Sequence, residues 1–363
     1  MAQMARTGQS LGRHIRTSSL PRRLARNVCC IWRFLSKEHF IKLRRRRFIG
    51  LAAGAAALPV VSRIARAQTY PSRPVRLIEG FGAGGTPDIV ARLIGQWLSE
   101  RLSQPFVVEN RTGVSGNIAT EAVVNAPPDG YTLLTVTTAN AIGATFYEKL
   151  NFDFIRDITP VAGTMRAPYV MEVNLSVPAK TVPEFMAYAK ANPGRLNMAS
   201  VGSGSGTHVV GELFKMMTGV DMVHVPYRSV PFSDLIGGQV QVYFGTLPSS
   251  IELIRAGRLR ALAVTTATRS QMLPEIPALG EFVPGYEASN WVGIGAPRNT
   301  PAEIVDKLNR EINAALADPR IKARFADLGG TVLPGSRADF GKLIADETEK
   351  WAKLIRAAHL KAE

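Results

Sequence analysis

The sequence predicts an α/β protein, for two reasons. Across residues 68–363, short apolar runs typical of strands alternate with longer segments whose apolar residues recur at helical spacing. A strand-like run also leads into a glycine-rich loop and a helix pattern in each half of this region. Such alternation indicates mainly parallel sheets flanked by helices. The region exceeds what one compact core usually holds, so we expect two lobes.

Residues 1–67 carry nearly all of the net charge of the chain. They hold fifteen of the 44 Lys and Arg residues but one of the 29 acidic residues, Glu38. The rest of the chain therefore has 29 basic and 28 acidic residues. Because no basic stripe is left in residues 68–363, we expect no nucleic-acid partner.

Residues 41–67 are typical of a twin-arginine signal peptide. Four arginines at 44–47 precede an apolar segment at 51–61, which is too short to anchor the chain in a membrane. Residues 65–67 (ARA) fit a small-x-small cleavage site. We therefore expect cleavage after Ala67 and a periplasmic location.

Residues 1–40 fit no part of a signal peptide, and we interpret them as an over-extension of the translation start. Both cysteines of the chain, Cys29 and Cys30, lie there. We therefore expect neither a disulfide nor thiol chemistry in the mature protein.

Local periodicity and turn signals predict the individual elements in order. We expect strands at residues 75–79, 106–109, 131–136, 161–173, 196–200, 222–225, 240–244, 259–265 and 291–296. We expect helices at residues 87–102, 182–191, 207–218, 250–255, 301–316 and 337–358.

The loop after the first strand contains Gly80, Gly82 and Gly85, which spell G-x-G-x-x-G. This pattern between a strand and a helix is typical of dinucleotide sites, where backbone N–H groups hold a pyrophosphate. An exported dinucleotide-dependent oxidoreductase is therefore one interpretation. Against it, Asp88 places an acid at the mouth of the helix, and the candidate ribose-binding acid, Glu109, lies 24 residues after Gly85, beyond the usual interval.

A second strand–loop–helix unit favours another kind of ligand. The strand at 196–200 leads into residues 202–208 (GSGSGTH), which fail the dinucleotide pattern, and then into a helix. Two such loops facing each other would offer two sets of N–H groups and two helix N-termini. That arrangement suits a small anion.

Catalysis and metal binding have little support. Neither Ser203 nor Ser205 lies in a G-x-S-x-G motif, and these serines are better explained as helix-capping residues. His208 and Glu212 share a helix face, but no third metal ligand has suitable spacing. We therefore expect neither an enzyme nor a bound metal or cofactor.

Several short motifs occur in a fixed order along the chain. They are residues 70–76 (YPSRPVR), 80–88 (GFGAGGTPD), 108–111 (VENR), 128–134 (PDGYTLL), 224–228 (HVPYR) and 259–265 (LRALAVT). In this order and spacing the chain resembles the Bug (Bordetella uptake gene) proteins, the extracytoplasmic substrate-binding components of tripartite tricarboxylate transporters. The resemblance covers nearly all of residues 68–363.

The resemblance implies a two-lobed, type II-like periplasmic-binding-protein fold with a ligand cleft between the lobes, each lobe a mixed, mainly parallel sheet flanked by helices. Lobe 1 would comprise residues 68–168 and 292–363, and lobe 2 residues 169–291. It also implies that a monomer captures a small organic acid and delivers it to membrane transporter subunits. That ligand would be a mono-, di- or tricarboxylate, or an amino acid. A sensor subunit that presents its ligand to a receptor is an alternative that the sequence leaves open.

Carried over to this chain, the ligand-binding units fall on residues 81–88 and 200–208. The ligand-binding residues that we expect are Phe81, Ala83, Gly84, Gly85, Asp88, Thr138, Ser200, Gly204, Ser205, Thr207, His208 and Tyr227. Phe81 and Tyr227 are expected to form apolar walls. Asp88 is expected either to cap its loop or to meet the ammonium group of an amino acid.

The chain departs from the family pattern in three places. The turn at 229–234 is two residues shorter, Gly245 stands where a polar residue is common, and residues 112–115 (TGVS) replace a Pro-Gly-Ala-Gly-like turn. We expect these departures to alter the shape of the pocket and not the fold.

Overall fold

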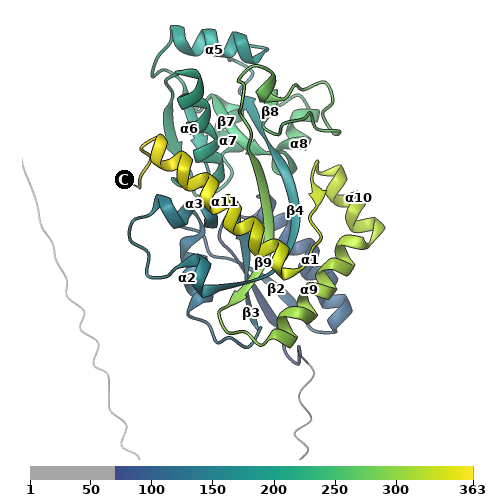
Figure 1. The fold of residues 1–363 in the computed structure, drawn as a ribbon. Coiled ribbons are helices and arrows are strands. Elements are labelled where there is room, and N and C mark those ends of the chain that lie inside the picture. Colours follow the sequence, from purple (N-terminus) through teal and green to yellow (C-terminus); the bar gives the residue numbers. More distant parts are fainter. Residues whose placement is uncertain (1–69, 363) are drawn as a thin grey trace, which may run out of the picture. The chain divides into compact units, whose positions relative to one another are not determined.

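A continuous mixed sheet organises residues 70–362, the part of the chain that the computed structural model describes (Figure 1). The predicted leader, residues 1–67, lies outside these described residues. The strands are β1 (Val75–Glu79), β2 (Phe106–Asn110), β3 (Thr132–Thr137), β4 (Ile158–Val173), β5 (Asn197–Ser200), β6 (Val223–Pro226), β7 (Val242–Thr246), β8 (Arg260–Val264), β9 (Ser289–Pro297) and β10 (Thr331–Val332).

Helices lie between most of these strands. The α-helices are α1 (Thr86–Leu102), α2 (Asn117–Val124), α3 (Thr138–Phe146), α4 (Phe154–Asp157), α5 (Val182–Ala191), α6 (Gly206–Thr218), α7 (Phe232–Gly237), α8 (Leu247–Arg255), α9 (Ala302–Ala317), α10 (Pro319–Asp327) and α11 (Arg337–Ala357). Two 3₁₀ helices lie at η1 (Val114–Gly116) and η2 (Leu279–Glu281).

The sheet has two parallel parts joined by long antiparallel strands. Its main order is β2-β1-β3-β9-β4-β7-β5-β6, and β8 and β10 also pair with β4. β1 is parallel to β2 and β3, and β5 is parallel to β6 and β7. We call β1–β3 with their flanking helices the first half, and β5–β8 with theirs the second half.

Strands β4 and β9 run between the two halves (Figure 1). β4 pairs antiparallel with β9 from Ile158 to Pro168, and with β7 from Tyr169 onward. This mixed α/β architecture confirms the predicted fold class. The sheet as a whole is not mainly parallel, because β4 and β9 pair antiparallel with their neighbours. The lobe boundaries at 168/169 and 291/292 stay a prediction.

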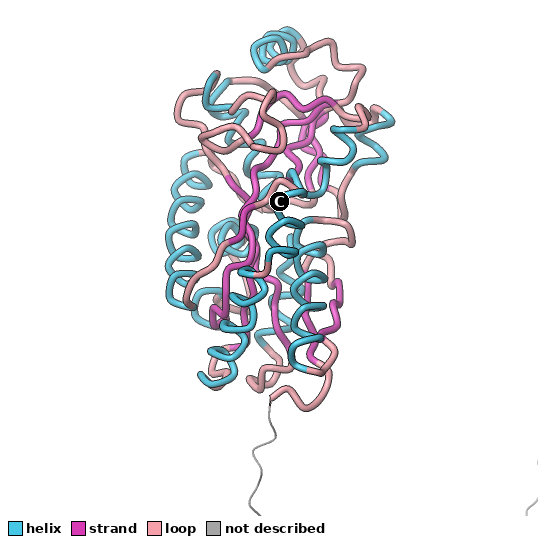
Figure 2. The backbone as a smooth tube through the Cα atoms, turned by 90° about the vertical axis from the view of Figure 1, so that its right-hand side faces the viewer, coloured by secondary structure: helices cyan, strands magenta, loops and turns pink. Residues whose placement is uncertain are grey.

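Apolar residues explain why these elements pack as they do. β3 and β9 are buried along their whole length, as expected for strands covered on both faces. Figure 2 shows helices on either side of the strands. α1 buries Val90, Ile94 and Leu98 against the first half, and α6 buries Leu213 and Phe214 against the second. Among residues 70–362, no helix is both long and apolar enough to cross a membrane.

The predicted strands are all present, with bounds shifted by a few residues at most, but several helices were not predicted. These are α2, α3, α4, α7 and α10. α3 matters most, because it begins at the ligand cavity described below. This helix is short and begins directly at the end of β3, so no turn signal in the sequence separates the two elements. Its start is fixed by a capping box between Thr137 and Asn140.

Candidate ligand-binding site

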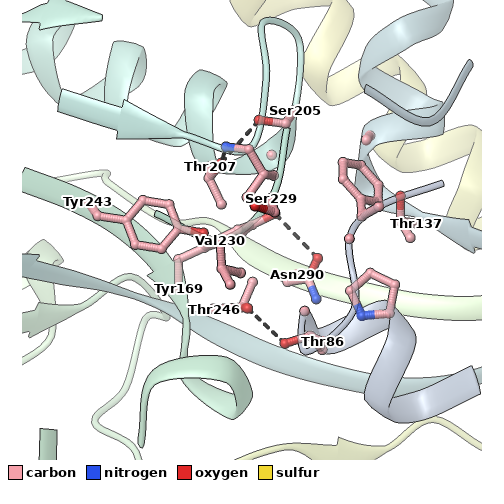
Figure 3. Close-up of a pocket in the computed structure, with 17 residues that line it drawn as sticks. Thr86, Thr137, Tyr169, Ser205, Thr207, Ser229, Val230, Tyr243, Thr246 and Asn290 are labelled. Atoms are coloured by element: carbon pink, nitrogen blue, oxygen red, sulfur yellow. Dashed lines mark hydrogen bonds between the residues drawn. The ribbon is translucent and has the colours of Figure 1, made fainter. Parts of the chain in front are cut away.

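A cavity of about 50 Å³ lies where loops from the two halves meet (Figure 3). Its lining consists of Phe81, Gly82, Gly85, Thr86, Pro87, Thr137, Ala139, Tyr169, Val201, Ser205, Gly206, Thr207, Ser229, Val230, Tyr243, Thr246 and Asn290. Hydroxyl groups are numerous in this set. Within the described part of the chain, no Asp, Glu, Lys, Arg or His side chain lines the cavity.

Four helices begin at this cavity. Their N-cap residues are Gly85 for α1, Thr137 for α3, Ser205 for α6 and Thr246 for α8, and all four line it. Each helix N-terminus carries partial positive charge and unpaired backbone N–H donors. The cavity is therefore electropositive without a cationic side chain, which suits a small anion.

The two glycine-rich loops share one backbone arrangement. Gly84 has a φ of +83° and donates its N–H to Asp88 Oδ2 at 3.0 Å. Gly204 has a φ of +79° and donates its N–H to His208 Nδ1 at 3.1 Å. A positive φ of this size favours glycine. In each loop the acceptor is the third residue of the following helix, so both glycine amides are used within the protein.

The N–H groups that are left for a ligand belong to the first residues of α1 and α6. Among residues 70–362, no acceptor faces the N–H groups of three lining residues, Thr86 in α1 and Gly206 and Thr207 in α6. Such groups in the first turn have no partner within the helix. Two opposed sets of free donors therefore remain, one from each half.

Asp88 holds the first loop in shape. Its carboxylate accepts hydrogen bonds from Gly84 N, from Arg92 Nε and Nη2 at 3.0 and 2.8 Å, and from Asn110 Nδ2 at 3.0 Å. Burial works against its ionisation, but the bonds from Arg92, Gly84 and Asn110 keep the pKa of Asp88 below its usual value. Of the two roles expected for Asp88, the contacts correspond to loop capping.

Histidines support the second loop from behind. The rings of His208 and His224 stack with centroids 3.9 Å apart, and Ser200 Oγ lies 2.6 Å from His224 Nε2. Burial, followed by the nearby His224 and Lys215, lowers the pKa of His208 to about 3. Burial, followed by Lys215, lowers the pKa of His224 to about 4. Both rings are therefore neutral at pH 7, and His208 Nδ1 is free to accept the Gly204 N–H.

Direct contacts join the two halves around the cavity. The hydroxyl groups of Thr86 and Thr246 are hydrogen-bonded at 2.7 Å, a bond drawn in Figure 3. Ser115 Oγ and Tyr147 Oη both donate to the carbonyl oxygen of Ser203, at 2.6 and 2.5 Å. The structure therefore has the cavity closed.

Comparison with known proteins decides the family. The tripartite tricarboxylate transporter family receptor matches residues 90–360. The chain belongs to this family. It is 35% identical over 313 residues to the protein BugT of Bordetella pertussis, with 85% of this chain and 94% of that protein covered. It is 36% identical over 323 residues to a UPF0065 protein of a Pseudomonas species, with 88% and 96% covered.

Solved structures give the same family and the same fold. The structure of R. palustris Rpa4515 with adipate has 38% identity and a TM-score of 0.79, covering 80% of this chain and 99% of that one. MatC from Rhodopseudomonas palustris with bound malate has 29% identity and a TM-score of 0.76, covering 79% and 100%. The periplasmic binding protein BugD has 29% identity and a TM-score of 0.78, covering 81% and 100%. The predicted Bug-type fold is thus confirmed.

Four of the predicted ligand-binding residues of this family receptor line the cavity. They are Phe81, Gly85, Ser205 and Thr207. The others lie beside or behind the lining, and they are Ala83, Gly84, Asp88, Thr138, Ser200, Gly204, His208 and Tyr227. The contact of each predicted residue with a ligand stays a prediction.

Two of these residues have other partners than expected. Thr138 Oγ1 accepts a hydrogen bond from Trp291 N at 3.2 Å, while its neighbour Thr137 lines the cavity. The Tyr227 hydroxyl donates to Asp234 Oδ2 at 2.8 Å, outside the lining. The role of Tyr227 as an apolar wall for the ligand stays a prediction.

Several lining residues were missed from sequence. Tyr169, Tyr243 and Asn290 lie on strands that the sheet topology brings to the cavity, and local spacing holds no signal for them. Thr246 was detectable, since a threonine followed within two residues by proline is typical of a helix start. The shortened turn does reach the site, because Ser229 lines the cavity.

The dinucleotide interpretation is not favoured. Glu109, the candidate ribose-binding acid, instead pairs with Arg76 and Arg111, both at 2.7 Å. A Cβ added to Gly82 would lie 2.9 Å from the Ser229 side chain, so the second half packs directly against this loop. The family match points the same way.

Proposed function

We propose that this protein is exported, captures a small dicarboxylate between its two halves and delivers it to the membrane subunits of a tripartite tricarboxylate transporter. The observation that carries the proposal is the meeting of four helix N-termini at one cavity without a charged side chain in its described lining. The free N–H groups form two opposed sets, and each set suits one carboxylate.

A dicarboxylate fits this cavity better than an amino acid. The ammonium group of an amino acid is positively charged, and helix N-termini without an acidic side chain in the described lining disfavour it. Asp88, the acid expected from sequence to serve, is already bonded to Arg92, Asn110 and Gly84. Relatives solved with adipate and malate support the same ligand class.

We also propose that the protein binds its ligand without transforming it. The described arrangement most like a catalytic pair is Ser200 with His224, at 2.6 Å. Ser200 is fully buried and does not line the cavity, and its Oγ also accepts the Gly202 N–H at 3.1 Å. These contacts fit a role in supporting the loop.

Export and the monomeric state belong to the same proposal. They rest on the signal-like residues 41–67 and on the family. Mass spectrometry of the protein recovered from the periplasm should give a chain that begins at Gln68, and light scattering should give the mass of one such chain. Retention of residues 41–67 in the periplasmic protein would contradict the export step.

A thermal-shift screen tests the ligand class. A ligand that binds the native state raises the melting temperature through linkage. Adipate, succinate and malate should raise it, whereas glutamate and NAD should leave it unchanged. A shift with NAD and with no carboxylate would overturn the proposal.

A further inference from the structure

Asn290 is a buried polar side chain with half of its amide unused. It lies in β9, is 5% exposed and lines the cavity among the residues shown in Figure 3. Within the described part of the chain, Asn290 Nδ2 is buried and has no hydrogen-bond partner. Buried donors are nearly always paired in native proteins, so a donor left free in a binding cavity points to a ligand acceptor.

The hydroxyl group of Tyr169 faces the oxygen of this amide. The Tyr169 hydroxyl donates to Asn290 Oδ1 at 3.4 Å, and burial raises the pKa of Tyr169, so the hydroxyl keeps its proton. The backbone of Asn290 is held by pairing with Ala167 of β4, and that of the next residue by the bond from Trp291 N to Thr138 Oγ1. With Oδ1 engaged, Nδ2 is the group left for a ligand.

Tyr169 contacts both Asn290 and the first residue of α6, so Asn290 lies toward the α6 end of the cavity. A Cβ added to Gly206 would collide with Tyr169 Oη, so this hydroxyl lies directly against the first residue of α6. The N–H groups of Gly206 and Thr207 at the same helix start have no acceptor among residues 70–362. Asn290 is therefore linked through Tyr169 to the α6 end of the cavity.

We propose that Asn290 donates a hydrogen bond from Nδ2 to a carboxylate oxygen of the ligand held at the N-terminus of α6, and so acts as a specificity-determining residue of this receptor. The inference rests on the proposed dicarboxylate-binding function. It also assigns a ligand contact to β9, one of the two strands that join the halves. Ligand binding and the junction between the halves would then share one side chain.

Asn290→Leu and Asn290→Asp test the proposal in the full chain. Leucine keeps the approximate shape and removes the donor, and aspartate replaces the donor by a negative charge. Calorimetric titration with adipate and with malate should show affinity lowered at least about tenfold for both ligands in Asn290→Leu, and lowered further in Asn290→Asp. Leucine also removes the Oδ1 that accepts the Tyr169 hydroxyl, so the ligand-free melting temperature of Asn290→Leu should fall modestly, and the titrations are run well below it.

Asn117 supplies a matched control. It is also a buried asparagine whose Nδ2 has no partner among the described residues, but it does not line the cavity. Asn117→Leu should leave the affinity for both ligands unchanged. Equal loss in Asn117→Leu and Asn290→Leu would show a general packing effect and overturn the proposal.

The outcomes separate this inference from the function on which it rests. Tight dicarboxylate binding by wild type together with unchanged binding by both Asn290 variants overturns the inference alone. Loss of malate binding with retained adipate binding also overturns it, since that pattern assigns Nδ2 to the malate hydroxyl group. Failure of the wild-type protein to bind any dicarboxylate overturns the proposed function and the inference together.

Discussion

The hydroxyl oxygens of Thr86 and Thr246 are 2.7 Å apart and form a hydrogen bond between the two halves of the protein. Thr86 is the first residue of α1, and Thr246 is the N-cap of α8. Both hydroxyls line the cavity, so the same pair closes the cleft and faces the ligand. Closure and ligand binding should therefore depend on each other.

Thr246→Val should weaken ligand binding. Valine keeps the branched shape and removes the hydroxyl that bonds Thr86. A net loss of about 1 kcal/mol, roughly a fivefold change in Kd, is expected from one such bond. Calorimetric titration with adipate measures it.

Thr300→Val is the control for that change. Thr300 is also buried and its hydroxyl donates to Pro297 O at 2.7 Å, but it does not line the cavity. It should lose stability to unfolding and keep its affinity for adipate. Unchanged affinity in Thr246→Val would rule out a role for the Thr86–Thr246 bond in binding.

Gly206→Ala should destabilise the fold, because its Cβ would collide with Tyr169 Oη. Overpacking of this kind costs about 1–3 kcal/mol in the free energy of unfolding. Tyr169→Phe removes the colliding atom, so the double variant should recover most of the loss. Urea denaturation measures the free energy of unfolding of Gly206→Ala, Tyr169→Phe and the double variant.

Gly237→Ala is the matched control for the glycine change. Apart from the chain neighbours of Gly237 and the backbone of its own helix, no described atom lies within 4 Å of the added Cβ. Alanine there should be neutral or stabilise the chain by up to about 1 kcal/mol. A double variant as unstable as Gly206→Ala alone would argue against the Tyr169 contact as the cause.

Acid should destabilise the protein through His208 and His224. Burial lowers the pKa of His208 to about 3 and the pKa of His224 to about 4, whereas an unfolded histidine titrates near pH 6.5. The unfolded chain therefore binds more protons between these values. The stability that these groups contribute is complete above about pH 6.5 and is lost progressively as the pH falls toward 4 for His224 and toward 3 for His208.

His208→Asn isolates this effect. The asparagine Oδ1 is able to accept the Gly204 N–H in place of His208 Nδ1 without taking up a proton. The free energy of unfolding should fall less steeply between pH 6.5 and 4 in the variant than in wild type. Equal slopes would mean that His208 is not buried in its neutral form.

Sequence reasoning found the two loops because their signal is local. Glycine at positions 84 and 204 reflects a positive φ, and the helix starts that follow supply donors. It did not identify which donors are free, because the acceptors at Asp88 and His208 are defined by side-chain placement in the folded chain.

The rest of the site depends on topology. Asn290 reaches the cavity because β9 pairs with β3 and β4 between the halves, and no local pattern marks it. α3 was missed because it is short and begins directly at the end of β3, with no turn signal between the two elements. Sequence therefore predicted the anion-binding loops, and the contacts of β9 came only from the structure.

Calorimetric titration of the purified protein with adipate, hexanoate and glutamate tests the central claim most directly. These ligands differ in having two carboxylates, one carboxylate, or two carboxylates and an ammonium group. Two opposed sets of N–H donors and no described charged side chain in the lining predict that adipate binds at least about a hundredfold more tightly than either of the others. Equal affinity for adipate and hexanoate, or tighter binding of glutamate, would contradict the account.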